Sequence, residues 1–296
     1  MDNPSVSVIV ATYRRDKSLT AALNSLAEQT FDSFEVIVVD DNASEEWNLK
    51  VAQIIQKVNH SSGMDIRHII CEQNGGSAKA RNIGINSAKG EFITFLDDDD
   101  LYLPEKIRSQ FDVMKKTGAD FGITDLLLYN ENGTVVDRRI RKYIKSYNRD
   151  DLLLYHLMHH MTGTDTLMFR SKFIREIGGF SGTDIGDEFY LIAEAINNGG
   201  RFCYQPECHV KAFVHTGHDG LSSGTAKIDG ENALYEYKKR YFEGLSKKQI
   251  RYIKSRHYAV LAYTYMRGGK FGRFVCNAIK SFAVSPRDCI GILLSR

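Results

Sequence analysis

Short apolar runs alternate with segments of helical periodicity along the first hundred residues. The runs with a strand-like composition, rich in Val, Ile and Phe, are residues 5–11, 34–39, 66–71 and 91–96. Between them, apolar residues recur at helical spacing, as at Leu19, Leu23 and Leu26. This alternation predicts βαβ units in an α/β fold whose sheet is mostly parallel and has helices on both faces.

The remainder of the chain changes pattern twice. Residues 101–235 mix strand and helix signals, and Asn130 to Gly133 form a turn signal between two apolar runs. From residue 236 the chain becomes basic and aromatic, which predicts a helical extension. We therefore expect three regions, 1–100, 101–235 and 236–296.

Charge is distributed unevenly, although the whole chain has 39 Lys and Arg against 37 Asp and Glu. Residues 236–296 hold 14 of the basic residues and only 3 of the acidic ones. Such a segment predicts contact with an anionic partner. Interleaved apolar residues favour a membrane surface, and they are Tyr252, Tyr258, Leu261, Tyr265, Phe271, Phe274 and Phe282. Packing of these side chains on the protein body, or in a homodimer, is the alternative.

Other partner classes are disfavoured. No nucleic-acid-binding motif accompanies the basic run. The five cysteines form no CxxC pair, which argues against a zinc site and favours a reducing compartment. The first residues do not resemble a signal peptide, and no apolar run approaches the length of about 18 residues that spans a bilayer. We expect a cytoplasmic protein that can be peripheral on the inner face of the cell membrane.

Four consecutive acids, Asp97 to Asp100, follow the last of these apolar runs. Ligands of a parallel sheet bind at the carboxyl ends of its strands, where Asp40 and Asp41 also lie. Crowded carboxylates repel unless a cation compensates them, and their hard oxygens suit Mg²⁺ or Mn²⁺ bridging to phosphate. A solvated acidic loop is the plainer interpretation. Position after a buried strand favours the metal and phosphate site.

Four segments together resemble the N-terminal half of family 2 glycosyltransferases. They are SVSVIVATYRR, VIVVDDNAS, NGGSAKARNIGINSAKGEFITFLDDDD and LYLPEKI. The resemblance is dense over residues 5–107 and looser to about 220. It implies the GT-A fold, Rossmann-like, with a nucleotide-sugar-binding half in 1–100 and an acceptor-binding half in 101–235.

The resemblance also implies which residues bind the donor. Asp41, or its neighbour Asp40, matches the acid that contacts the base, and Asp97 matches a contact to ribose or donor sugar. Asp99 matches the metal ligand, with Asp98 as the alternative register. The other implied donor contacts are Thr12, Tyr13, Arg14, Asn74, Gly76, Ala78 and Arg81.

The second half is expected to supply the catalytic base. Asp187 and Glu188 resemble the family's paired acids, in which the second deprotonates the acceptor hydroxyl; here that is Glu188, and Asp187 remains a rival. Thr164 and Asp165 fall where similar enzymes contact sugar hydroxyls. His215 falls where some relatives place a histidine near the metal.

The resemblance implies an inverting, metal-assisted transfer of a sugar from a UDP-sugar to an acceptor hydroxyl. The acceptor class is a saccharide or lipid-linked saccharide of surface-polysaccharide assembly. The alternatives are a nucleotidyltransferase, which should carry a Gly-rich loop after the first strand, and a non-catalytic nucleotide- or carbohydrate-binding protein.

Overall fold

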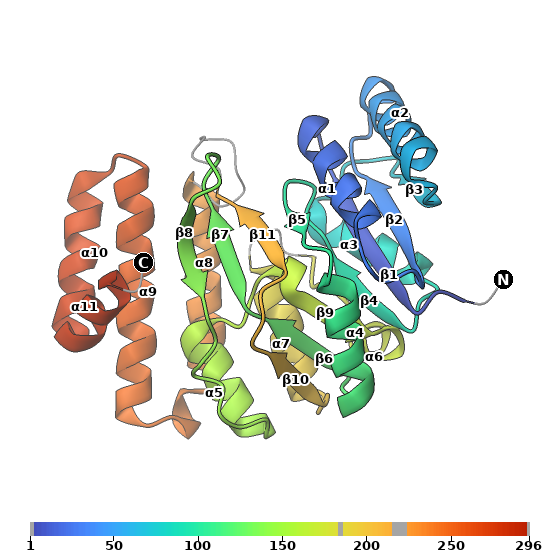
Figure 1. Ribbon diagram of the computed structural model, residues 1–296. Helices are drawn as coiled ribbons and strands as arrows, with labels where there is room; N and C mark the ends of the chain where they lie inside the picture. The colour runs from blue at the N-terminus through green and yellow to red at the C-terminus, as the bar shows by residue number, and fades with distance from the viewer. Residues whose placement is uncertain (1–2, 183–185, 215–223, 295–296) are drawn as a thin grey trace. The chain divides into compact units, whose positions relative to one another are not determined.

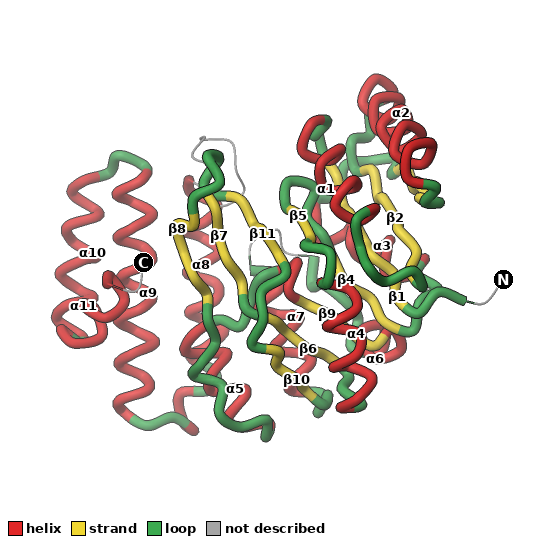
Figure 2. Tube along the Cα trace, viewed as in Figure 1, coloured by secondary structure: helices red, strands yellow, loops and turns green. Residues whose placement is uncertain are grey.

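The computed structural model describes residues 3–182, 186–214 and 224–294, and forms two compact units (Figure 1). The first unit comprises residues 1–153 and 161–214, and the second comprises 154–160 and 215–296. The first unit is a mixed α/β structure with a central sheet flanked by helices, as the alternating pattern predicts (Figure 2).

The central sheet has seven strands in the order β10-β6-β9-β4-β1-β2-β3. Its strands are β1 (Val6–Thr12), β2 (Phe34–Asp40), β3 (Ile66–Ile70), β4 (Phe92–Phe95), β6 (Phe121–Thr124), β9 (Leu167–Arg170) and β10 (Phe202–Gln205). β1 to β4 are mutually parallel, and β6 is parallel to β10. Only β9 runs antiparallel to its neighbours β4 and β6. The sheet is therefore mostly parallel.

Helices cover both faces because the strands are apolar on both sides. Val6, Val8 and Val10 of β1 point into the core shared with α1 (Lys17–Ala27), α2 (Glu45–Ser62) and α4 (Lys106–Thr117). Ile9 points to the opposite face, where α3 (Ser77–Ser87) packs so closely that Gly84 has no room for a side chain. α6 (Ser171–Glu176) also covers this face, since Phe95 meets Phe180 just beyond it with ring centroids 5.2 Å apart.

A smaller sheet of four strands has the order β5-β11-β7-β8. Its members are β5 (Leu101–Tyr102), β7 (Leu126–Tyr129), β8 (Val135–Arg139) and β11 (Val210–Phe213). β7 and β8 are antiparallel and joined through the predicted turn at Asn130 to Gly133. The short helix η1 (Thr164–Thr166) and α7 (Asp187–Asn197) complete the elements that carry predicted site residues.

The C-terminal unit is helical. It contains α8 (Gly224–Lys239), η2 (Phe242–Gly244), α9 (Lys247–Arg267), α10 (Phe271–Val284) and α11 (Pro286–Leu294), and α5 (Arg149–His159) contributes its second half. Ser246 begins α9 with a capping box, because its side chain accepts from Gln249 and the Gln249 side chain accepts from Ser246. Within the described residues, no helix is both long and apolar enough to cross a membrane.

The close packing of α3 on β1 predicts that one added methyl group at Gly84 lowers the stability of the protein. A Cβ at Gly84 would lie 2.5 Å from Cγ2 of the buried Ile9. Gly84→Ala should therefore lower the free energy of unfolding by about 1–3 kcal/mol through overpacking, measured by urea denaturation. The matched control is Gly272→Ala in α10, where nothing lies within 4 Å. That change should stabilise its helix by up to about 1 kcal/mol, and equal effects of the two would contradict the packing argument.

Candidate active site

The predicted site residues lie where the parallel strands end. Thr12 and Asp40 are register partners at the ends of β1 and β2, and β4 ends at Phe95, opposite Ile9. The loops that leave these strands therefore start side by side. This places the acids after β2 and the acids after β4 at one edge of the central sheet.

Asp41 organises the glycine-containing loop before α3. Its carboxylate accepts hydrogen bonds from the backbone N–H groups of Gly75 (2.9 Å) and Gly76 (2.8 Å) and from the Asn74 side chain (3.1 Å). Gly76 has φ 83°, a conformation that favours glycine. Asp40 is fully buried and accepts from Asn42 (2.7 Å), with His68 at 3.0 Å. Asp41 thus borders the site, and Asp40 fixes the strand end beneath it.

The loop after β1 contacts the middle acids of the cluster. The Thr12 hydroxyl donates to Asp98 at 2.7 Å, and the Tyr13 N–H donates to the same oxygen at 3.3 Å. Arg15 forms an ion pair with Asp99 at 2.9 Å. Burial raises the pKa of Asp98 to about 7, against the hydrogen bond from Thr12 that lowers it. Asp98 is consequently a partly protonated group near neutral pH.

Arg81 joins the acid loop to the second half of the unit. Its guanidinium lies 2.7 Å from Asp97 and 3.0 Å from Asp187, which is 106 residues away in sequence. Burial alone would lower the pKa of Arg81, but the charges of Asp97 and Asp187 outweigh it and raise that pKa. Burial raises the pKa of Asp187 to about 7, although Arg81 opposes this shift. Arg81 therefore remains charged and compensates the buried Asp187 and the half-buried Asp97.

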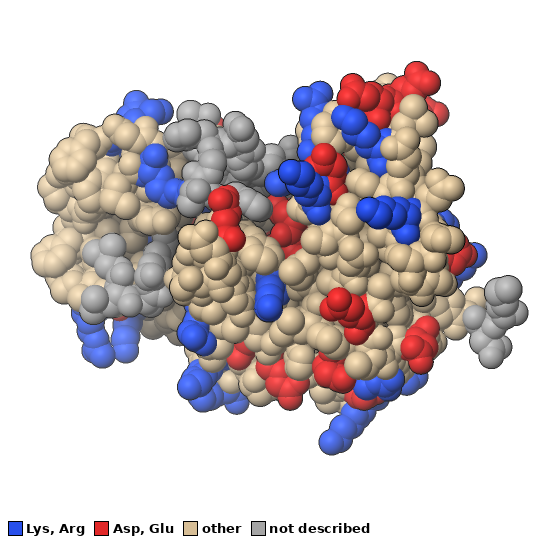
Figure 3. Space-filling view, turned by 45° about the horizontal axis from the view of Figure 1, so that its top comes forward, with Lys and Arg blue, Asp and Glu red and all other residues tan. Residues whose placement is uncertain are grey.

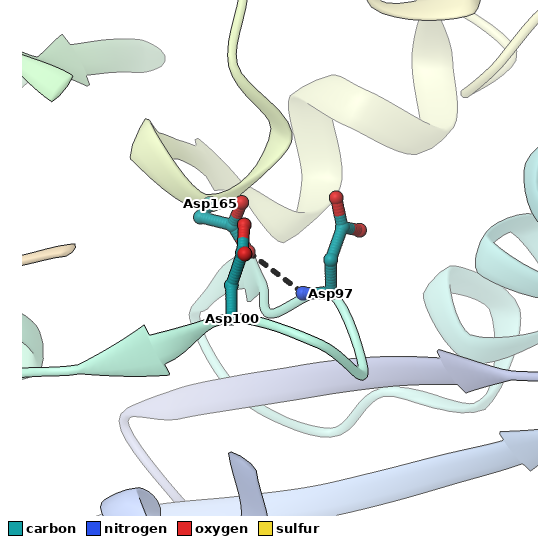
Figure 4. Close-up of side chains that lie close together, drawn as sticks. All are labelled: Asp97, Asp100 and Asp165. Carbon is teal, nitrogen blue, oxygen red and sulfur yellow. Dashed lines mark hydrogen bonds between the residues drawn. The ribbon is translucent and has the colours of Figure 1, made fainter. Parts of the chain in front are cut away.

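Asp97, Asp100 and Asp165 gather their carboxylates at one point (Figure 4). One oxygen from each lies within 4.8 Å of the others, and the Asp97 N–H donates to Asp165 at 2.7 Å. The Phe213 N–H donates to Asp100 at 2.8 Å. Burial raises the pKa of both Asp100 and Asp165; the charge of Asp165 adds to the shift of Asp100, and the charge of Asp97 adds to the shift of Asp165. Buried hard oxygens with too little compensating charge are a donor set that fits a divalent cation.

Glu188 is held in place from η1. Its Oε1 accepts hydrogen bonds from the Thr164 N–H at 3.1 Å and from the Thr164 hydroxyl. Its Oε2 accepts none from the described part of the chain. Asp187 differs, because Arg81 occupies one of its oxygens and the Glu188 N–H, at 2.8 Å, occupies the other. The half-buried Glu188 thus keeps an oxygen available, and the buried Asp187 does not.

The remaining predicted residues differ in where they lie. Tyr13 and Arg14 are exposed beside the site, and Arg14 stacks on Tyr13 at 5.2 Å. Ala78 is buried at the start of α3. His215 lies outside the described residues. The structure brings the other predicted residues to one edge, with Thr164 touching Glu188 and Asp165 lying in the acid cluster.

Two residues at the site were missed by sequence reasoning. Arg15, which pairs with Asp99, follows directly on the predicted Arg14, and a second arginine after the first strand was the available signal. Asp100 was counted among four acids but received no role. It is 6% exposed and turned toward Asp165.

The comparisons with known proteins identify a family. A family model described as Glycosyl transferase family 2 matches residues 7–176. The chain is 30% identical over 149 residues to WfgD of Escherichia coli, UDP-Glc:alpha-D-GlcNAc-diphosphoundecaprenol beta-1,3-glucosyltransferase. That match covers 50% of this chain and 56% of WfgD, so the similarity extends over little more than half the relative's length.

Two solved structures share the fold. The chain aligns with S. aureus TarS 1-349 in complex with UDP-GlcNAc at a TM-score of 0.60 and 19% identity, covering 94% of this chain and 91% of that one. For the mannosyltransferase PcManGT from Pyrobaculum calidifontis, in complex with GDP-Man and Mn²⁺, the TM-score is 0.58 at 17% identity, covering 99% and 79%. These likenesses confirm the predicted fold class.

Arg81 generates a pH-dependent prediction. Arg81→Met leaves Asp97 and Asp187 without their counter-charge and should cost about 3–5 kcal/mol of unfolding free energy at pH 8. The cost should shrink at pH 5, because Asp187, with its pKa already raised to about 7, is then protonated. Urea denaturation at both pH values measures the difference.

The control for that variant is Arg139→Met. Arg139 pairs with Asp137 at 3.4 Å, with side chains 46% and 33% exposed, so its loss should cost about 0–1 kcal/mol at either pH. If Arg81→Met lowers the free energy of unfolding only slightly, or by the same amount at pH 5 and pH 8, the proposed role of the Arg81 ion pairs is contradicted.

Proposed function

Since this chain belongs to glycosyl transferase family 2, we propose that it moves a sugar from a UDP-sugar to an acceptor hydroxyl with inversion at the anomeric carbon. The observation that carries the proposal is the convergence of the acid loop after β4 with the Thr164–Glu188 pair. The family assignment favours glycosyl transfer over nucleotidyl transfer or binding without catalysis.

The donor would bind at the edge formed by β1, β2 and β4. Asp41 and the loop it holds, from Asn74 to Gly76, border the space proposed for the base. Tyr13 and Arg14 offer an exposed ring and a cation beside it. TarS supports a UDP-linked donor by its bound UDP-GlcNAc, and WfgD by its name. Because PcManGT is in complex with GDP-Man, the identity of the donor's nucleotide needs a direct test.

A divalent ion, Mn²⁺ or Mg²⁺, is proposed at the acid cluster. The family resemblance assigns Asp99 as a ligand, with Asp98 as the alternative. The carboxylates that lie close enough together to share an ion are those of Asp97, Asp100 and Asp165. Asp99 is held by Arg15 at 2.9 Å, and its side chain is 20% exposed, so its carboxylate borders the site. When bound, the ion would neutralise negative charge that develops on the departing diphosphate.

Glu188 is proposed as the general base. A base must hold a free oxygen within reach of the acceptor hydroxyl, and Oε2 of Glu188 meets this requirement better than Asp187 does. Thr164 orients the carboxylate through the other oxygen. Arg81, fixed by Asp97 and Asp187, keeps the donor side and the base side in register.

The acceptor is proposed to be a saccharide linked to a lipid diphosphate, in surface-polysaccharide assembly. WfgD, whose name includes a diphosphoundecaprenol acceptor, supports this class. Such an acceptor would place the reaction at the inner face of the cell membrane.

Donor binding provides the first test. The unfolding free energy is measured with a panel of UDP-, GDP-, CMP- and dTDP-sugars in the presence of Mn²⁺. A UDP-sugar should raise it by about 2.7 kcal/mol at a hundredfold excess over Kd. Asp99→Asn should remove the Mn²⁺-dependent part of the response. Asp150→Asn, at a side chain 91% exposed on α5, is the matched control and should keep it. A response to a GDP-sugar alone would overturn the nucleotide assignment.

Transfer and binding should separate at Glu188. Glu188→Gln should keep donor binding and lower kcat by about 10²–10⁴-fold, because the amide cannot accept the hydroxyl proton. Glu194→Gln, on an exposed position of the same helix, should leave kcat unchanged. Asp187→Asn should instead weaken donor binding through Arg81. Normal turnover by Glu188→Gln would transfer the role of base to another group.

A further inference from the structure

Helix α10 carries its apolar side chains on the outside. Phe271, Val275, Ile279 and Phe282 form one stripe at helical spacing, and we call it the α10 face. Their exposed fractions are 69%, 37%, 63% and 52%. Isolated exposed apolar residues are ordinary, but four on one stripe of one helix are a continuous surface.

The orientation of α10 is fixed by buried polar contacts. Ser281 is fully buried, and its hydroxyl donates to the Ser255 carbonyl of α9 at 2.8 Å. The two hydroxyls are also 3.1 Å apart, and Asn277 is buried on the same side. Rotating the stripe inward would expose these groups and break the contacts. The exposure of the α10 face is therefore built into the packing of the unit.

Only part of the series of apolar residues expected at a membrane lies on this face. Leu261 is buried in α9, and Tyr258, Tyr265 and Phe274 are half-buried, as is Tyr252. These residues pack within the helical unit. Phe271 and Phe282 remain exposed, so α10 rather than the whole basic segment presents the surface.

Positive charge borders the α10 face. From Met266 to Leu294 there are five basic residues, Arg267, Lys270, Arg273, Lys280 and Arg287, and one acid, Asp288. Arg273 lies over the Tyr265 ring at 5.6 Å and Lys280 over the Tyr258 ring at 5.7 Å, so both cations lie along the flank of α10 that meets α9. In Figure 3 the surface at the left of the view, over these helices, is largely uncharged with basic side chains at its borders.

We propose that the α10 face binds the surface of a membrane containing anionic lipid. Exposed Phe and Ile side chains would enter the interfacial region, while the bordering cations meet lipid phosphates. A second copy of this chain fits less well, because a symmetric contact would bring the same cations together. The inference goes beyond sugar transfer, and its test uses vesicle binding alone, so it can fail without affecting the proposed reaction.

The test is co-sedimentation of the full chain with vesicles of phosphatidylcholine and phosphatidylglycerol in equal parts, compared with phosphatidylcholine alone. The triple variant Phe271→Ser, Ile279→Ser, Phe282→Ser should weaken binding to the anionic vesicles by at least about a hundredfold. Its matched control, Leu49→Ser, Ile70→Ser, Val136→Ser, removes side chains that are 57%, 52% and 46% exposed in the other unit. That control should bind as the unchanged protein does.

Charge is tested separately. Lys270→Gln with Arg287→Gln should weaken binding to anionic vesicles about thirtyfold, at about fivefold per charge, and should leave the weak binding to phosphatidylcholine unchanged. The control, Lys172→Gln with Arg201→Gln, removes two exposed cations of the first unit. Circular dichroism and thermal unfolding of each variant verify that the fold is kept.

Three results would overturn the proposal. The first would be that the unchanged protein does not sediment with anionic vesicles. The second would be that the α10 variants sediment as well as their controls do. Alternatively, analytical ultracentrifugation shows a dimer that the triple serine variant dissociates, which would assign the face to a second copy of the chain.

Discussion

The candidate site depends on one buried guanidinium between two carboxylates. Arg81 touches Asp97 at 2.7 Å and Asp187 at 3.0 Å, and so ties the loop after β4 to the start of α7. A buried charge without a partner is costly, so the three groups stabilise one another only while all are present. The adjacency of Glu188 to Asp187 then brings the proposed base to the same edge as the proposed donor site.

This arrangement brings several carboxylates close together, which costs free energy when they are ionised. Burial raises the pKa of Asp98 and Asp187 to about 7, and Asp100 and Asp165 are shifted in the same direction. Groups held near their pKa at neutral pH are typical of functional sites, where charge is arranged for a ligand rather than for stability. The ammonium of Lys106 lies below the cluster, bonded to Tyr102 at 2.9 Å, and burial lowers its pKa to about 7. The carboxylates of the site thus have few compensating positive charges, and these charges lie close to them.

The helical unit shows a second departure from optimal burial. A helix in a packed unit normally buries its apolar stripe. In α10 the contact between Ser255 and Ser281 places a polar stripe inside and Phe271, Ile279 and Phe282 outside. Exposure of this stripe to water is unfavourable, and burial against another apolar surface would relieve it. Both departures, the acid cluster and the α10 face, lie at surfaces to which we assign a ligand.

The sequence by itself determined the sheet and the edge that carries the site. Alternating apolar runs and helical periodicity require βαβ units, and parallel strands bring the residues after them to one edge. The acids that follow β2 and β4 were therefore predictable at one edge from their positions alone, whereas Thr12 was named from the family resemblance. Tertiary structure decided which charges pair: Arg15 with Asp99, Arg81 with both Asp97 and Asp187, and Thr164 with Glu188. It also decided which side of α10 faces outward. These outcomes depend on contacts between residues far apart in the chain. The periodicity of a segment indicates its secondary structure and its apolar face, but not which other segment packs against it.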